Sequence, residues 1–306
     1  MQPKPIMQPK VELAKIRDFG EIISDTFLFV RQNIKPLLKY FFTFCGIFVA
    51  GGIISASLFQ LKWTGTMNSI RGGSFNTNEY RPSPFSFFGP EYFLLILFGM
   101  LSFIALTVTF LSYIALYKEK DKQVPTTEEM WGYIKYYFLR VLGSSLLLYL
   151  LLFIATLLCG IPGIYLSPIF ALIFPIMVME NASFGYAFNR SFFLIKDNWW
   201  MTFGSLVVIW IIFYVAIMVI SIPTSIINMV SLIAVPQKGG GALSVPAAII
   251  GAVLQQLCQV FAVLPVTALA LCYFNLTESK DGTSLMDKIN KLGTNTPNTD
   301  LPAEEY

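Results

Sequence analysis

The chain has 306 residues, of which 55% are hydrophobic and only 13% are charged, and its formal net charge is +3. Soluble domains carry about 25% charged residues, so this composition excludes a soluble globular protein and predicts an integral membrane protein. The small net charge excludes nucleic acid as an expected partner, and the absence of histidine removes the commonest acid–base catalyst and metal ligand.

Residues 1–17 are predicted to form a flexible arm that begins with the duplicated segment MQPKPIMQPK. We expect no signal peptide, because the first long apolar run begins only near Leu37 and no small-residue cleavage site follows a short apolar core. A membrane domain is predicted over 18–278, followed by a cytoplasmic tail over 279–306 whose acidic end is disordered.

The first predicted element is an amphipathic helix over FGEIISDTFLFVRQNIKPLL, from Phe19 to Leu38. Its apolar side chains recur every three or four residues, which places them on one helical face: Phe19, Ile22, Ile23, Thr26, Phe27 and Val30. A helix of this kind that leads into an apolar run is typical of the membrane interface, with its rings among the acyl chains and its charges in water.

Six apolar segments are long enough, or nearly so, to cross about 30 Å of hydrocarbon. They lie at about 37–59, 92–117, 139–159, 163–179, 199–222 and 245–275. The third and fourth are joined by the uncharged segment CGIPGIYLSP, which predicts a tight helical hairpin because its Gly and Pro residues interrupt a helix. The alternative is a re-entrant pair that never fully crosses, since the fourth segment has little more than the minimum length.

A second copy of the amphipathic segment, FGYAFNRSFFLIKDNWWMTFG, begins 165 residues after the first. Four residues are identical at this offset: Phe19 and Phe184, Gly20 and Gly185, Phe27 and Phe192, and Asn33 and Asn198. Trp199 and Trp200 follow, at the depth of the lipid headgroups, where indole rings are favoured. A third segment shares the pattern but not these identities, and it opens with a capping box of Thr126 and Glu129.

The predicted fold is therefore an all-α membrane protein with six transmembrane helices in three hairpins, each preceded by a cytoplasmic interfacial amphipathic helix. The three pseudo-repeats cover about 18–120, 126–180 and 182–278. With six crossings and the N-terminus inside, 17 of the 21 basic residues lie on the cytoplasmic side. The positive-inside rule thus predicts a protein of the bacterial cytoplasmic (inner) membrane with both termini in the cytoplasm.

A family resemblance lies in the segment MENASFGYAFNRSFFLIKDNWW, and its best-matched part is 180–205. An acidic residue ends a span, a helix of small and aromatic residues follows, and R-S-x-x-L-x-K and paired tryptophans come next. This pattern is similar to the membrane domain fused to some glycerophosphodiester phosphodiesterases and to related bacterial multi-pass proteins. The catalytic part of the fused members resembles a TIM barrel with histidines, whereas this chain has no histidine and no soluble stretch near the roughly 250 residues of a barrel. The resemblance implies the membrane module alone.

Motifs of known enzymes are absent from the sequence. No Walker loop, Rossmann fingerprint, H-E-x-x-H or G-x-S-x-G occurs. The cysteines lie in apolar runs without metal-ligand spacing, as expected for buried free thiols: Cys45, Cys159, Cys258 and Cys272. We expect no enzyme activity, no cofactor and no metal.

Two polar groups of residues are candidates for function. Gln255 and Gln259 are predicted to share a face of the sixth segment, either for hydrogen bonds between helices or, with Asn228, as a polar path for a substrate or lipid. Glu180 ends the fourth segment, and it either pairs with Arg190 or leaves Arg190 to bind lipid phosphate.

The distinctive residues lie in interfacial helices, which favours a non-enzymatic scaffold or regulatory module at the cytoplasmic membrane interface. Its expected partners are membrane lipids and a membrane or cytoplasmic protein; the oligomeric state is not indicated. The alternative is a transporter or lipid-translocating protein. The residues expected to contact lipid are Phe19, Gly20, Phe27, Asn33, Phe184, Gly185, Arg190, Phe192, Asn198, Trp199 and Trp200.

Overall fold

The computed structural model describes residues 10–71, 88–234 and 241–282, and every element within them is helical. The helices, in chain order, are α1 (Phe19–Tyr40), the π-helix η1 (Phe41–Cys45), α2 (Gly46–Arg71), α3 (Pro90–Glu119), α4 (Thr127–Cys159), α5 (Ile161–Met179), α6 (Phe184–Ile195), α7 (Trp199–Ala234), α8 (Gly241–Leu257), the 3₁₀-helix η3 (Cys258–Ala262) and α9 (Val263–Asp281).

Six helical stretches in the described residues are long and apolar enough to span a membrane, which confirms the predicted number. They are Phe19–Trp63, Pro90–Glu119, Thr127–Leu157, Ile161–Met179, Trp199–Pro223 and Ile249–Asp281. The chain is therefore a multi-pass integral membrane protein. The predicted tail over 279–306 lies mostly outside the described residues.

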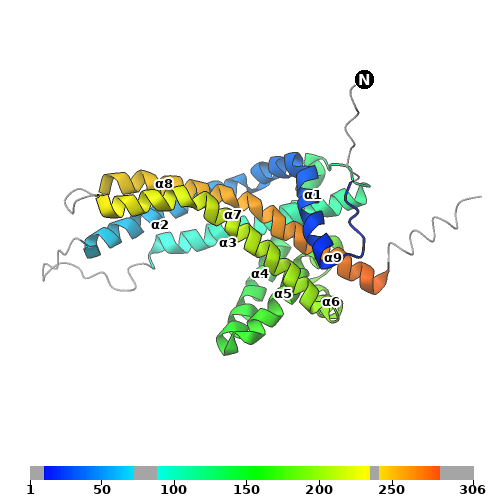
Figure 1. Cartoon of the computed structure of the whole chain (residues 1–306). Coiled ribbons are helices and arrows are strands. Elements are labelled where there is room, and N and C mark those ends of the chain that lie inside the picture. The colour runs from blue at the N-terminus through cyan, green and yellow to red at the C-terminus, as the bar shows by residue number, and fades with distance from the viewer. Residues whose placement is uncertain (1–9, 72–87, 235–240, 283–306) are drawn as a thin grey trace, which may run out of the picture.

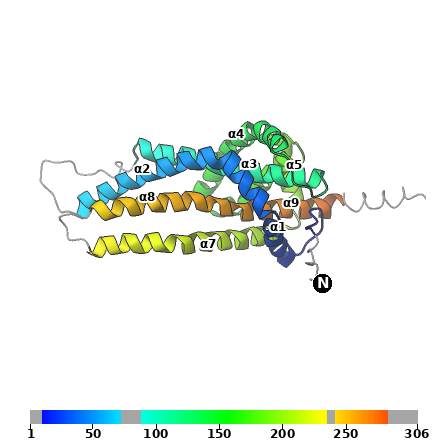
Figure 2. The same cartoon turned by 90° about the horizontal axis from the view of Figure 1, so that it is seen from above.

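The helices form a long bundle with a side branch (Figure 1). The helices α2, α3, α7 and the continuous α8–η3–α9 run along one axis, and the α4–α5 hairpin leaves this axis at a steep angle. The start of α1 and the end of α9 lie at the same end of the bundle, while the end of α2 and the start of α8 lie at the opposite end (Figures 1 and 2).

The first amphipathic helix is not separate from the span that follows it. α1 continues through η1 into α2, and the chain bends between α1 and α2 (Figure 1). Pro36 removes a backbone donor inside α1, and the π-helix over Phe41–Cys45 then widens one turn. Proline and π-bulges are the usual causes of such a kink.

The amphipathic segment from Thr126 also differs from the predicted arrangement, because it forms the first turns of α4. Its capping box is present: the Thr126 hydroxyl accepts from the Glu129 N–H, and the Glu129 carboxylate accepts from the Thr126 N–H. No proline interrupts the 33 residues of α4, so the helix continues into the span. Of the three predicted amphipathic helices, only α6 is short and separate from a span.

The connection between α4 and α5 is a one-residue turn at Gly160, whose φ of +74° suits glycine because a Cβ would be strained there. Pro168, inside α5, has no N–H to offer the Ile164 carbonyl, and the Ser167 hydroxyl donates to that carbonyl instead, at 2.9 Å. The structure thus contains the tight hairpin that the sequence predicts.

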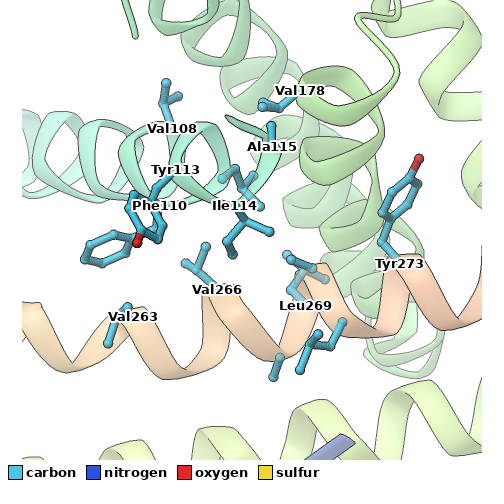
Figure 3. Packing of buried hydrophobic residues seen from close by; sticks show 14 of the residues in the cluster. Val108, Phe110, Tyr113, Ile114, Ala115, Val178, Val263, Val266, Leu269 and Tyr273 are labelled. Carbon is cyan, nitrogen blue, oxygen red and sulfur yellow. The ribbon is translucent and has the colours of Figure 1, made fainter. Parts of the chain in front are cut away.

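The core lies where α3, α5 and α9 meet, towards the end of the bundle that holds α1. Figure 3 shows side chains of α3 and α9 facing one another, including Phe110, Ile114 and Val266. These residues are 0–5% exposed, and every residue of α9 from Val263 to Leu276 is buried. A helix that is apolar and buried on all sides is the centre of its bundle, and α9 packs against α1, α3, α5, α6 and α7.

Candidate functional site

The two matched amphipathic segments bury corresponding positions. All four buried residues of α6, which are Ala187, Ser191, Leu194 and Ile195, correspond at the offset of 165 to buried residues of α1, which are Ile22, Thr26, Phe29 and Val30. Both helices pack against α9. The shared face therefore holds both helices on the same central helix.

The aromatic rings of the predicted face lie at its edge instead of beneath the helix. Phe19 is 42% exposed, Phe27 is 40% exposed and Phe192 is 37% exposed. Phe184 is half-buried, and Gly20 and Gly185 are exposed. Phe19 also lies at the start of α7, because its ring is 3.4 Å from where a Cβ of Gly204 would stand. The rings are therefore available to lipid or to another protein at the end of the bundle that holds α1.

Aromatic contacts fix α6 alongside α5. The rings of Phe170 and Phe188 are 6.0 Å apart, and Phe188 is 5.1 Å from Phe192. Where α7 begins, Trp199 stacks on Tyr165 at 5.4 Å and donates its indole N–H to the Tyr165 carbonyl at 3.1 Å. Because α6 runs back along α5, the start of α7 comes to lie beside the first turns of α5.

Trp200 and the two matched asparagines have different environments. Trp200 is 79% exposed, so it presents its indole beyond the protein surface. Asn33 is buried, donates to the Phe29 carbonyl at 3.0 Å and accepts from the Tyr113 hydroxyl at 2.8 Å. Asn198 is half-buried, and its carbonyl accepts the Thr202 N–H at 3.0 Å, so it begins α7. Asn33 thus serves packing inside the bundle.

Arg190 is paired with protein carboxylates. Its guanidinium forms ion pairs with Glu180, at 3.5 Å, and with Asp281. The Tyr273 hydroxyl donates to the same Glu180 carboxylate at 3.0 Å. At 3.5 Å the contact from Arg190 Nε is an ion pair and not an aligned hydrogen bond. This cluster joins the end of α5, the middle of α6 and the end of α9, so of the two predicted roles for Arg190, the structure shows pairing.

A second ion pair joins the α6–α7 turn to α9, where the Lys280 ammonium donates a hydrogen bond to the Asp197 carboxylate. That hydrogen bond and the positive charge of Lys280 hold the pKa of Asp197 below its usual 3.8. A lowered folded-state pKa contributes stability above the unfolded-state pKa, and this contribution is lost as the pH falls through the folded-state pKa.

We expect the melting temperature of the wild-type protein to fall as the pH drops below about 4. Asp197→Asn should melt slightly lower at neutral pH and show a smaller acid-induced fall, because its side chain does not titrate. The change is small, since the Asp197 side chain is 64% exposed. Asp121→Asn is the control. If the melting temperature of Asp197→Asn falls with decreasing pH as steeply as that of the control, the prediction is contradicted.

Residues 10–17, which the sequence analysis assigns to a flexible arm, lie packed against the bundle. Val11 and Leu13 are 4% exposed, and the Arg17 side chain is 0% exposed. The Arg17 backbone N–H donates to the Asn275 side chain of α9 at 2.8 Å. We call residues 10–17 the N-terminal strap. No local pattern in the sequence marks it, since its partners lie up to 258 residues away.

A cavity of about 570 Å³ lies between the α4–α5 hairpin and the bundle. Its walls come from the middle of α3, α4, α5 and α7 and from η3: Gly99, Phe103, Leu106, Ser145, Leu148, Tyr149, Leu152, Ser167, Phe170, Ala171, Phe174, Trp210, Phe213, Tyr214, Gln259 and Ala262. None of these residues is charged, and seven are aromatic. The cavity is therefore apolar and suited to a hydrocarbon ligand.

Gln259 is the only residue of the predicted polar path that lines this cavity within the described part of the chain. Gln255 is exposed, and Gln259 donates to the buried Gln256 instead. Gln256 and Gln259 are three residues apart and therefore neighbours on the helix surface, and the helix tightens to a 3₁₀ form shortly after Gln256, over Cys258–Ala262. The side chain of Asn228 lies outside the described residues.

The thiols are placed as expected where they are described. Cys45, Cys258 and Cys272 are free and buried, and the side chain of Cys159 lies outside the described residues.

Comparison with known proteins gives no relative. No protein-family model, no curated protein and no solved structure matches the chain. The resemblance of 180–205 to the phosphodiesterase-associated membrane domain therefore stays a prediction from the sequence.

Proposed function

We propose that the chain is a non-enzymatic membrane module that organises or regulates a protein partner, or lipids, at the cytoplasmic face of the bacterial inner membrane. The observation that supports this proposal is the set of exposed rings carried by helices whose opposite faces are buried on α9. Phe19, Phe27, Phe192 and Trp200 are 37–79% exposed. Rings held on a rigid support suit a binding surface, because little side-chain freedom is lost on contact.

The charge distribution supports the cytoplasmic placement of this surface. Lys10 and Lys15 lie in the strap, the Lys10 ammonium donates to the Lys122 carbonyl, Lys120 stands two residues before Lys122, and Lys280 lies in the last turn of α9. Basic side chains near the membrane are attracted to the anionic lipids of the cytoplasmic leaflet. Both termini then face the cytoplasm.

The environment of α6 favours the re-entrant arrangement of the α4–α5 hairpin. α6 has 12 residues, too few to cross about 30 Å of hydrocarbon, and charges flank both of its ends: Glu180 before it, and Lys196 and Asp197 after it. Both ends of α6 then stay near water on one side, and α5 lies beside it. In this arrangement α2, α3, α7 and α8–α9 cross the membrane. The α4–α5 hairpin enters the bilayer and returns to the same side without fully crossing it.

The test replaces the exposed rings by serine and measures which lipids and proteins stay bound to the protein. We expect the double variants Phe19→Ser/Phe27→Ser and Phe192→Ser/Trp200→Ser to keep their melting temperature but to lose a stoichiometric protein partner or retained lipid in native mass spectrometry from the protein's own membranes. The matched control is Phe153→Ser/Ile154→Ser, whose side chains are 64% and 48% exposed on the hairpin. Ring variants that retain the same lipids and proteins as the control would refute the proposal.

The second candidate function is transport or lipid translocation, and the cavity at Gln259 favours it. This function requires a path that opens to water, so a Gln259→Cys variant in a background without native cysteines should react with a water-soluble maleimide from at least one side of the membrane. A residue 259 sealed from both sides would count against translocation.

A further inference from the structure

The cavity between the α4–α5 hairpin and the bundle lies at mid-depth in the chain's long helices. Its α3 wall, Gly99 to Leu106, falls in the middle of Pro90–Glu119, and its α7 wall, Trp210 to Tyr214, falls well inside Trp199–Ala234. The volume of about 570 Å³ lies within the usual range for a bound small molecule. An apolar cavity of this size at this depth is accessible to lipid chains and closed to strongly hydrated molecules.

The charge of the cavity wall limits the ligand. No lining residue is charged, so a phosphate or carboxylate placed here would lack a counter-charge and would be removed from water. A phospholipid could therefore insert only the end of a tail. A ligand that enters entirely must be uncharged.

Gln259 adds a requirement for one polar group. The Gln259 side-chain N–H donates a hydrogen bond to the Gln256 side-chain carbonyl oxygen, while the Gln259 Oε1 atom is buried without a hydrogen-bond partner. A buried amide group left without a partner is destabilising. The last side-chain torsion of glutamine is broad, so the free side of the amide can turn towards the cavity that Gln259 lines. A hydroxyl group suits either orientation of the amide, because it both donates and accepts.

We propose that this cavity binds one uncharged hydrocarbon chain that carries a free hydroxyl group, with the hydroxyl on Gln259 and the chain among the aromatic rings of α5 and α7. Two sources share this chemistry, a free long-chain alcohol and a neutral glyceride with one free hydroxyl. The proposal concerns the same cavity as the translocation candidate but requires binding only, and binding and water access are measured separately.

The test uses Trp210, which lines the cavity, as the reporter. The full-length protein in nanodiscs of an unbrominated phospholipid is titrated with 9,10-dibromostearyl alcohol, whose bromine atoms quench a nearby tryptophan. We expect saturable quenching that Trp210→Phe abolishes. A diglyceride with the same brominated chains is the second probe, and 9,10-dibromooctadecane, which lacks the hydroxyl, is the comparison ligand.

Two variants change the cavity, and each has a matched control. Gly99→Leu fills the cavity from α3, where an added Cβ meets no atom within 4 Å, and Gly143→Leu makes the same change at an exposed site that is equally free of contacts. Gln259→Leu removes the amide at similar volume, and Gln255→Leu does so at an exposed glutamine. We expect both cavity variants to weaken binding of the alcohol about tenfold or more, and both controls to bind as the wild type does.

The outcomes separate the parts of the proposal. Quenching that rises linearly without saturation reports partition into the bilayer, and it would overturn the site. Equal binding by Gly99→Leu and Gly143→Leu would overturn the cavity as its location. Equal affinity for the alcohol and for dibromooctadecane, or no loss in Gln259→Leu, would overturn the role of the hydroxyl. The probe that binds more tightly identifies the source as a free alcohol or a glyceride.

Discussion

Replacing Arg17 by alanine is expected to lower the free energy of unfolding by about 2–4 kcal/mol, because a buried charged donor would be removed from its acceptors. The guanidinium donates to the Asp25 carboxylate at 2.8 Å and to the carbonyls of Leu13, at 2.9 Å, and Lys15, at 3.0 Å. It also donates to the Glu12 carbonyl. Without it, these carbonyls lose their partners and the strap loses its fixed path, so proteolysis between residues 10 and 17 should accelerate.

Arg31→Ala is the control, since Arg31 lies exposed on α1 and its loss should change the free energy of unfolding by less than about 0.5 kcal/mol. Arg17→Lys should recover only part of the loss, because one ammonium cannot replace a planar group that bonds to four acceptors. The measurement is unfolding in a mild detergent at neutral pH. Equal stability of Arg17→Ala and Arg31→Ala would show that the strap is held without the Arg17 guanidinium, by its apolar side chains and backbone hydrogen bonds.

Replacing Gly163 by valine is expected to destabilise the α4–α5 hairpin by about 1–3 kcal/mol, because overpacking forces backbones apart. An added Cβ would stand 2.5 Å from the Thr156 Oγ1 atom and 3.3 Å from the Thr156 Cα atom. The hydroxyl can rotate, but the Cα atom belongs to α4 and cannot move without its helix. The expected result is a lower melting temperature together with increased labelling of cysteines placed in the hairpin.

Gly143→Val is the matched control, because a Cβ at Gly143 meets no atom within 4 Å in the same helix pair. A smaller pair of changes tests the contact itself. Gly163→Ala should destabilise, and adding Thr156→Ala should recover part of the loss, since neighbouring residues couple. Strictly additive effects of the two changes would mean that the close approach of α4 and α5 is not what requires glycine.

The sequence best predicts those structural features that depend on residues close together along the chain. The number of helices long and apolar enough to span a membrane follows from runs of apolar residues, and the buried positions Ile22, Thr26 and Val30 follow from helical periodicity. Periodicity does not separate the centre of a face from its edge, so it predicts Phe19 and Phe27 on the same face although they lie at its exposed border.

Features that depend on distant contacts could not be predicted. The strap is held by Asn275 on the last helix, and the Trp199 ring lies on Tyr165 because α6 runs back along α5. The hydrogen-bonded glutamines are Gln256 and Gln259 and not the predicted Gln255 and Gln259, and the helix tightens to a 3₁₀ form just beyond Gln256. Such a change in helix type depends on packing and leaves no signal in a helical projection of the sequence.

The hairpin that runs beside α6 also has a mechanical consequence. In the re-entrant arrangement, α4, α5 and α6 add their cross-section to the leaflet on the charged side, while the opposite leaflet accommodates only the helices that cross. The protein then has the shape of a wedge, and it expands one leaflet more than the other. Lateral pressure and membrane curvature therefore become variables that favour or oppose its folded shape, independently of any ligand or partner.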